Sequence, residues 1–271
     1  MLTRIIPATK EALPVIGLGT YRGFDVTLNA PGEERLSNVL DTLFAAGGTL
    51  LDSSPMYGRA EEVVGALLTR QPRADSPFLA TKVWTSGREA GVRQIEQSFR
   101  LLRSDVIDLI QVHNLQDWQT HLQTLRGLKE AGRIRYIGIT HYTRSGYAEV
   151  ERVLNTTPVD FLQINYSVEE REAEKRLLPL AEDKGVAVLC NRPFGGGDLL
   201  RRLKAKPLPD WAEEVGATSW AQLALKFVLG HRAITCAIPG TGNPASMIDN
   251  TKAASGSVLT PKQRAELIET V

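Results

Sequence analysis

Four side chains in the first half of the chain could together protonate a carbonyl oxygen. Asp52 and Tyr57 follow one apolar run, Lys82 lies near the end of the next, and His113 ends a third. A tyrosine is a weak acid with an ordinary pKa of about 10, and a nearby ammonium stabilises the phenolate and lowers that pKa. A carboxylate keeps such a lysine charged and placed, and a histidine can orient a carbonyl by a hydrogen bond. These are the groups needed to protonate oxygen while a hydride arrives at carbon.

Each of these residues also has a structural explanation. Asp52 could cap a turn through Ser53 and Ser54, Lys82 could be a buried lysine paired with Asp52, and His113 could be a satisfied core histidine. The coincidence of all four at the ends of three successive strand-like runs favours one shared site over separate structural roles.

The elements that must position them alternate along the chain. Short apolar runs rich in β-branched residues are typical of strands buried on both faces, and amphipathic stretches that predict helices lie between them. The predicted strands are residues 15–19, 49–53, 78–83, 107–113, 136–140, 161–165, 186–191 and 234–238. The predicted helices are residues 33–46, 60–69, 90–102, 119–131, 146–154, 173–184, 220–229 and a last one opening at Pro244 with Asn243 as its cap.

Eight strands, nearly all followed by a helix, predict an α/β fold of the (β/α)8 TIM-barrel type, with residues 1–271 as a single domain. Such barrels take about 250 residues, and their reactive groups lie at the C-terminal ends of the strands. The rival is an open doubly wound sheet. It would usually carry a Gly-x-Gly-x-x-Gly fingerprint, which residues 17–22 do not match. Residues 207–209 are interpreted as a loop insertion after the seventh strand.

Composition narrows the class of protein. The 271 residues are 42% hydrophobic and 23% charged, as in ordinary globular chains, and the net charge of +1 gives no long-range attraction to nucleic acid or an anionic membrane. No apolar run reaches the roughly 18 residues of a membrane span. Cys190 and Cys236 form no Cys-x-x-Cys pair, and the four histidines form no ligand pair, so no metal is expected. A cytoplasmic location is expected, with a removed leader left open.

The sequence resembles the aldo-keto reductase family over nearly its whole length. The resemblance rests on several short motifs that occur in the family's order. They are Leu-Gly-Thr-Tyr at 18–21, Leu-Asp-Ser-Ser-Pro-Met-Tyr-Gly at 51–58, Thr-Lys-Val-Trp at 81–84, Leu-Ile-Gln-Val-His at 109–113, Gly-Arg-Ile-Arg-Tyr-Ile-Gly at 132–138 and Ile-Pro-Gly-Thr at 238–241.

The resemblance implies roles for the four residues. Tyr57 is expected to be the general acid, with Lys82 and Asp52 lowering its pKa, and His113 to orient the carbonyl or help protonate it. Hydride is expected to come from a nicotinamide cofactor without metal, so the chain is expected to be an NAD(P)H-dependent reductase of aldehydes and ketones. The same resemblance implies the barrel fold that the alternation suggests independently.

The resemblance also implies a cofactor site along the strand ends. Its expected residues are Gly19, Thr20, Tyr21, Asp52, Thr140, His141, Gln163, Asn191, Arg192, Pro193, Phe194, Gly195, Ile238, Pro239, Gly240, Thr241, Gly242, Met247 and Asn250. The chain departs from the family at Asn191, where an aromatic residue often stacks on the nicotinamide. It also carries no Lys or Arg in residues 238–250, where family members pair the 2′-phosphate of NADPH. NADPH is expected on family precedent, with NADH as the alternative.

Tyr21, Met56 and Trp84, together with His113, are expected to line the substrate pocket, and an aromatic wall suits apolar carbonyl compounds. Trp84 could instead belong to the core. The expected partner is a small carbonyl molecule and the expected state a monomer. Two alternatives stay open: a nicotinamide-binding regulatory protein with vestigial activity, and a metal-dependent lyase or hydrolase on the same barrel.

Overall fold

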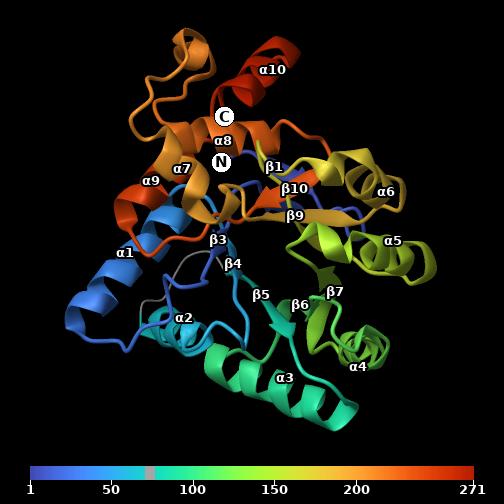
Figure 1. The fold of residues 1–271 in the computed structure, drawn as a ribbon. Coiled ribbons are helices and arrows are strands. Elements are labelled where there is room, and N and C mark those ends of the chain that lie inside the picture. The colour runs from blue at the N-terminus through green and yellow to red at the C-terminus, as the bar shows by residue number, and fades with distance from the viewer. Residues whose placement is uncertain (71–76) are drawn as a thin grey trace.

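The computed structural model describes residues 1–70 and 77–271 and has a sheet of eight parallel strands at its centre. Each strand pairs with the strands before and after it in the chain (Figure 1). The strands are β3 (Leu18–Gly19), β4 (Leu50–Asp52), β5 (Phe78–Val83), β6 (Ile107–His113), β7 (Ile134–Thr140), β8 (Phe161–Asn165), β9 (Ala187–Asn191) and β10 (Ile234–Ala237).

Isolated bridges between the first and last strands close this sheet into a barrel. Ile16 pairs with Ala237, and Gly19 with Gly240, both in parallel. The N–H of Gly17 donates to the carbonyl of Ala237 at 2.9 Å, and the N–H of Ala237 donates to the carbonyl of Val15 at 2.8 Å. Closure confirms the predicted barrel and excludes the open doubly wound sheet.

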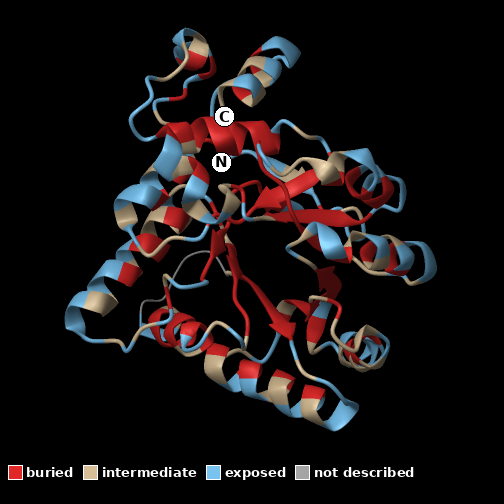
Figure 2. Ribbon diagram, in the orientation of Figure 1, coloured by how far each residue is buried: buried red, intermediate tan, exposed pale blue. Residues whose placement is uncertain are grey.

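Helices surround the strands, as Figure 1 shows, and Figure 2 shows buried residues along one side of most of them. The helices are α1 (Ala30–Ala45), α2 (Ala60–Arg70), α3 (Arg88–Leu102), α4 (Trp118–Glu130), α5 (Tyr147–Thr156), α6 (Leu177–Asp183), α7 (Asp198–Leu203), α8 (Trp220–Leu229), α9 (Pro244–Lys252) and α10 (Pro261–Thr270). None of the helices in residues 1–70 and 77–271 is long and apolar enough to cross a membrane.

Alternation along the strands divides the barrel interior into an apolar and a polar layer. Successive side chains of a strand point to opposite faces. Early inward positions are apolar and form one buried cluster that includes Leu50, Phe78, Leu109 and Phe161. Residues two or four places later on the same faces are Asp52, Lys82, Gln111, His113, Thr140, Gln163 and Asn191. The polar side chains therefore gather at the C-terminal end of the barrel.

A hairpin that was not predicted packs against the opposite end. Strands β1 (Thr3–Ile5) and β2 (Ala12–Pro14) pair antiparallel. Ile6 and Leu13 belong to the same buried cluster as the early strand residues. The two strands have only three residues each, too short for an alternation signal.

Most predicted elements are confirmed, and one helix is corrected. Strands β5, β6 and β8 and helix α8 match the predicted bounds, and Asn243 caps α9 through the N–H groups of Ala245 and Ser246. The predicted helix 173–184 is instead a short 3-10 turn at Glu172–Lys175 followed by α6. Pro179 has no N–H for the carbonyl four residues earlier, and the backbone leaves the helical region at Arg176.

The segment after β9 also carries more structure than predicted. Helix α7 precedes residues 207–209, and a 3-10 helix at Asp210–Val215 follows them, so the loop insertion is only the short link between the two. Arg201, Arg202, Lys204 and Lys206 lie exposed on this segment.

Candidate active site

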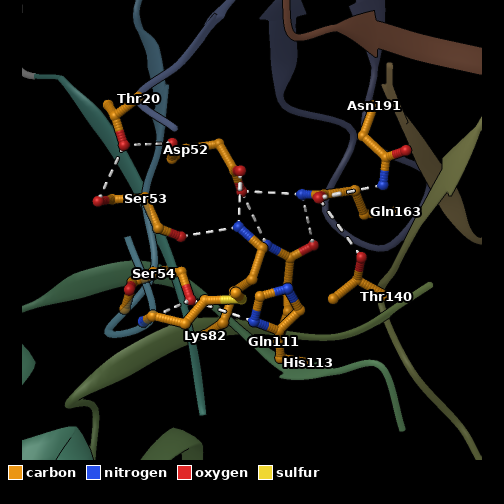
Figure 3. Close-up of polar contacts among 12 residues, drawn as sticks. Thr20, Asp52, Ser53, Ser54, Lys82, Gln111, His113, Thr140, Gln163 and Asn191 are labelled. Carbon is orange, nitrogen blue, oxygen red and sulfur yellow. Dashed lines mark hydrogen bonds and ion pairs between the residues drawn. The ribbon is translucent and has the colours of Figure 1, made fainter. Parts of the chain in front are cut away.

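The closest contact in the site is an ion pair at the polar end of the barrel. Nζ of Lys82 lies 2.6 Å from Oδ2 of Asp52, and the two side chains are 0% and 2% exposed. The ammonium also donates to the carbonyl of Ser53 at 2.7 Å (Figure 3). Burial by itself would lower the pKa of Lys82, but the Asp52 carboxylate and the Tyr57 hydroxyl together outweigh burial, so the pKa is raised. The lysine is therefore held as a cation.

Tyr57 lies against this cation. Nζ of Lys82 is 4.9 Å from the centre of the Tyr57 ring. Burial raises the pKa of Tyr57, while the Lys82 ammonium lowers it and the Asp52 carboxylate raises it; the net direction is upward. The structure thus modifies the expectation of a lowered value, because desolvation of the phenolate outweighs its attraction to the ammonium. The phenol is protonated at neutral pH.

His113 is neutral and has a defined partner. Burial, with the Lys82 and His141 charges, lowers the pKa of His113 to about 3. Its Nδ1 lies 3.1 Å from Oγ of Ser54, and that hydroxyl accepts from the N–H of Met56 at 3.3 Å. The Ser54 hydroxyl keeps its own proton for donation to Nδ1, and in that tautomer Nε2 carries the N–H of the ring. His113 can then donate a hydrogen bond but not an acidic proton.

Two buried amides hold the other oxygen of Asp52. Oδ1 accepts from Nε2 of Gln163 at 2.8 Å and from Nε2 of Gln111 at 3.1 Å. Nε2 of Gln163 also donates to Oε1 of Gln111 at 3.2 Å. Asp52 is therefore bonded to Lys82, Gln111 and Gln163, which accounts for the side chain without a turn-capping role.

Beyond Gln163 the network reaches the end of β9. Nδ2 of Asn191 donates to the carbonyl of His141 at 3.1 Å and to Oε1 of Gln163 at 3.4 Å. Thr140 also donates to Oε1 of Gln163, at 3.4 Å. Oδ1 of Asn191 is buried without a partner in the described part of the chain. This oxygen is available to accept a hydrogen bond from a bound molecule.

Aromatic side chains surround Tyr57 and His113 at the barrel mouth. The ring of Tyr21 lies 5.0 Å from that of Tyr57, and the ring of Trp84 lies 6.2 Å from that of His113. Trp84 is 41% exposed, so it is not a core residue, and Tyr21 and Met56 are exposed as well. Tyr21 and Trp84 therefore flank the polar cluster, and Met56 lies in the loop after β4, where its N–H donates to Ser54.

The remaining predicted residues at the ends of β3, β7 and β9 differ in availability. Thr20 is buried, and its hydroxyl bonds to the main-chain carbonyl of Asp52 and to the hydroxyl of Ser53. The imidazole of His141 bonds to the carbonyl of Thr143 and packs over Gly146. This side chain therefore stabilises the loop that follows β7. The Arg192 guanidinium lies 3.9 Å from the Glu170 carboxylate. It also lies beside Gly196. This glycine belongs to a run that begins at Gly195, directly after Pro193 and Phe194.

The Arg35 guanidinium on α1 lies against the segment 238–250, which contains no Lys or Arg of its own. Nη1 of Arg35, on α1, donates to the carbonyl of Gly242 at 2.8 Å. A Cβ at Gly242 would lie 3.2 Å from that nitrogen, so the glycine leaves room for the guanidinium. Ile238, Pro239, Gly240 and Thr241 lead into α9, where Met247 and Asn250 are buried, and the Met247 side chain packs in the core.

Sequence reasoning missed three residues here: Ser54, Gln111 and Arg35. A signal existed for Gln111, since it precedes His113 by two residues on one strand and must face the same side. Ser54 was considered only as a turn residue. Arg35 carries no local signal, because its contact with Gly242 spans more than 200 residues.

Comparison with known proteins is consistent with this arrangement. Residues 15–270 match the model of the aldo/keto reductase family. The chain belongs to this family.

Among its relatives, aldo-keto reductase YhdN of Bacillus subtilis is 31% identical over 192 residues, which are 64% of this chain and 56% of that protein. The chain thus spans little more than half of that relative. Methylglyoxal reductase YeaE of Escherichia coli is 27% identical over 88% of this chain and 84% of its own length. The structure of a Klebsiella pneumoniae aldo-keto reductase in complex with NADPH is 26% identical and has a TM-score of 0.81. The match covers 100% of this chain and 95% of the Klebsiella pneumoniae chain.

Proposed function

We propose that this chain reduces the carbonyl group of aldehydes and ketones to an alcohol with NADPH as the reductant. The observation that carries the proposal is the cluster of Tyr57, Lys82, Asp52 and His113 at the barrel mouth, with Lys82 fully buried against Asp52. The relatives named as reductases support it.

Tyr57, Lys82 and His113 have different roles at the carbonyl oxygen of the substrate. Tyr57 gives its proton to that oxygen as charge develops there, and the Lys82 ammonium stabilises the phenolate that remains. Neutral His113 donates a hydrogen bond that orients the oxygen toward Tyr57. Solvent then returns a proton to Tyr57. Asp52 keeps Lys82 charged throughout.

Polar side chains at the ends of β7, β8 and β9 could bind the nicotinamide end of the cofactor. Asn191 offers a buried carbonyl oxygen without a partner, and Thr140 and Gln163 lie beside it. An amide with both a donor and an acceptor fits such a set. These residues would hold the carboxamide of NADPH, which when bound supplies the hydride to the carbonyl carbon.

The rest of the cofactor site follows the chain toward α9. The pyrophosphate would lie against Arg192 and the glycines that begin at Gly195. The adenosine end would lie against residues 238–242 and α9. Arg35 supplies the positive charge that residues 238–250 lack. The Klebsiella pneumoniae relative in complex with NADPH supports this choice of cofactor over NADH.

The substrate class, the compartment and the assembly state complete the proposal. Tyr21, Met56 and Trp84 favour small apolar or aromatic carbonyl compounds. Residues 1–271 are proposed as one barrel domain that acts as a monomer in the cytoplasm. Two buried free cysteines and a net charge of +1 fit a reducing compartment and no nucleic-acid partner.

The test follows NADPH absorbance with 4-nitrobenzaldehyde for the wild type and Tyr57→Phe. The expected result is turnover by the wild type and its loss in the variant, with NADPH binding unchanged by tryptophan fluorescence. Equal rates in both proteins would overturn the tyrosine mechanism. Binding without turnover in the wild type would overturn the reductase itself.

A further inference from the structure

Asp52 bonds to Lys82 through one oxygen only. Oδ2 accepts from Lys82 at 2.6 Å, while Oδ1 accepts from Gln163 at 2.8 Å and from Gln111 at 3.1 Å. The amides thus determine which carboxylate oxygen faces the ammonium. A carboxylate without them would be free to turn both oxygens toward the cation.

Gln111 is built into this position by its neighbours. It is fully buried in β6, where its register partners are Lys82 on β5 and Gly138 on β7. A Cβ at Gly138 would lie 2.9 Å from Cγ of Gln111, so the glycine leaves space for the side chain. Oε1 of Gln111 accepts from Gln163, which turns its NH2 group toward Asp52. Its orientation is therefore fixed.

We propose that Gln111 is a positioning residue for proton transfer: its amide holds Oδ1 of Asp52, so that Oδ2 alone faces Lys82 and the ammonium stays against Tyr57. This inference rests on the proposed reductase function and assigns a residue that acts through Asp52 and Lys82 rather than on substrate. Gln163 also donates to Oδ1 of Asp52, but it is proposed to bind the cofactor as well. Gln111 lies wholly within the barrel.

The consequence concerns the acidity of Tyr57. The titratable groups that face it are Lys82, Asp52, Tyr21 and His113. Lys82 lowers the pKa of Tyr57 and Asp52 raises it. Without the Gln111 amide the Asp52 carboxylate loses one hydrogen-bond donor, so its negative charge is less compensated and attracts Lys82 more strongly. Both changes raise the pKa of Tyr57.

The test uses 4-nitrobenzyl alcohol oxidation with NADP+, in which Tyr57 acts as the base and the rate rises as the phenol ionises. For Gln111→Met, the rising limb of kcat against pH is expected to move up by at most about one pH unit, because a hydrogen bond to a charged group sets the upper bound and Gln111 acts on Tyr57 only through Asp52 and Lys82. KM for 4-nitrobenzyl alcohol is expected to change less than about twofold, since Gln111 does not touch substrate. Gln111→Asn, which withdraws the amide by one carbon, is expected to move the limb in the same direction.

Gln263→Met is the matched control. Gln263 is also buried and donates to a carboxylate, that of Glu214 at 3.0 Å, but it lies on α10. It is expected to lose stability without moving the limb. A limb unchanged in both Gln111 variants, or moved equally in the control, overturns the positioning role while the reductase stands. A wild type without turnover overturns both.

Discussion

Ser54 and His113 form a hydrogen bond that links the loop after β4 to the end of β6, with Oγ and Nδ1 3.1 Å apart. Ser54 also accepts from the N–H of Met56, so one hydroxyl fixes both the loop and the imidazole ring. The orientation of His113 toward a bound carbonyl therefore depends on a residue that would never contact the substrate.

Ser54→Ala is expected to lower kcat/KM for 4-nitrobenzaldehyde about tenfold, because His113 loses the partner that fixes its ring and tautomer. Steady-state kinetics measure the change. Ser98→Ala is the control, since Ser98 is a buried serine of α3 outside the barrel. Equal losses in both variants would show that Ser54 only stabilises the fold.

His113 is expected to make the fold less stable in acid. Its pKa is about 3 in the folded state against an ordinary 6.5, so the unfolded chain binds the proton more tightly between these values. Stability contributed by the neutral ring is complete above pH 6.5 and is lost as pH falls toward 3. Between pH 7.5 and pH 5 the loss is about 2 kcal/mol.

The measurement compares urea unfolding of the wild type and His113→Asn at the two pH values. The variant is expected to lose less stability than the wild type over this interval. A parallel loss in both proteins would mean that other groups, such as His141 and His231, whose pKa values are also lowered by burial, account for the acid sensitivity.

Arg35 is expected to determine the choice between NADPH and NADH. Arg35→Ala should weaken NADPH binding about tenfold, since a charge-assisted bond to phosphate is lost, and leave NADH binding within about twofold. Quenching of tryptophan fluorescence gives both dissociation constants. Arg201→Ala removes a cation of the exposed segment after β9 and should change neither. A change in Arg201→Ala alone would move the phosphate site to that segment.

Trp84 is expected to select aromatic substrates. Trp84→Ala should raise KM for 4-nitrobenzaldehyde about fivefold through the loss of ring contact, and change KM for propanal less. Comparing the two aldehydes within one variant cancels effects on cofactor binding. An equal rise for both would assign Trp84 to the shape of the site rather than to recognition of the ring.

Gly138 is expected to tolerate no side chain. Gly138→Ala would place Cβ 2.9 Å from Cγ of Gln111 and 3.1 Å from the carbonyl of Phe161, and the overpacking should cost about 1–3 kcal/mol of unfolding free energy. Gly127→Ala is the matched control. A Cβ there meets nothing within 4 Å in α4, so it should stabilise by about 0.5–1 kcal/mol. Urea midpoints that move alike would contradict this account.

The sequence by itself predicted the barrel and the convergence of Tyr57, Lys82, Asp52 and His113 at its mouth. Strands buried on both faces are continuous apolar runs, and their regular alternation with helices leaves few topologies. Asp52, Lys82 and His113 lie on or directly at strand ends, so their convergence follows from the parallel sheet. The hairpin β1–β2 was not predicted, because its strands are too short for a pattern.

Only the tertiary structure decided how these residues act. The neutral state of His113, the direction of the pKa shift of Tyr57 and the one-sided contact of Asp52 depend on burial and on distances between strands. The contact between Arg35 and Gly242 depends on barrel closure, which brings α1 beside α9. Sequence pattern gives the face on which a side chain lies. Electrostatics and hydrogen bonding depend on ångström distances between segments far apart in the chain, which no local pattern encodes.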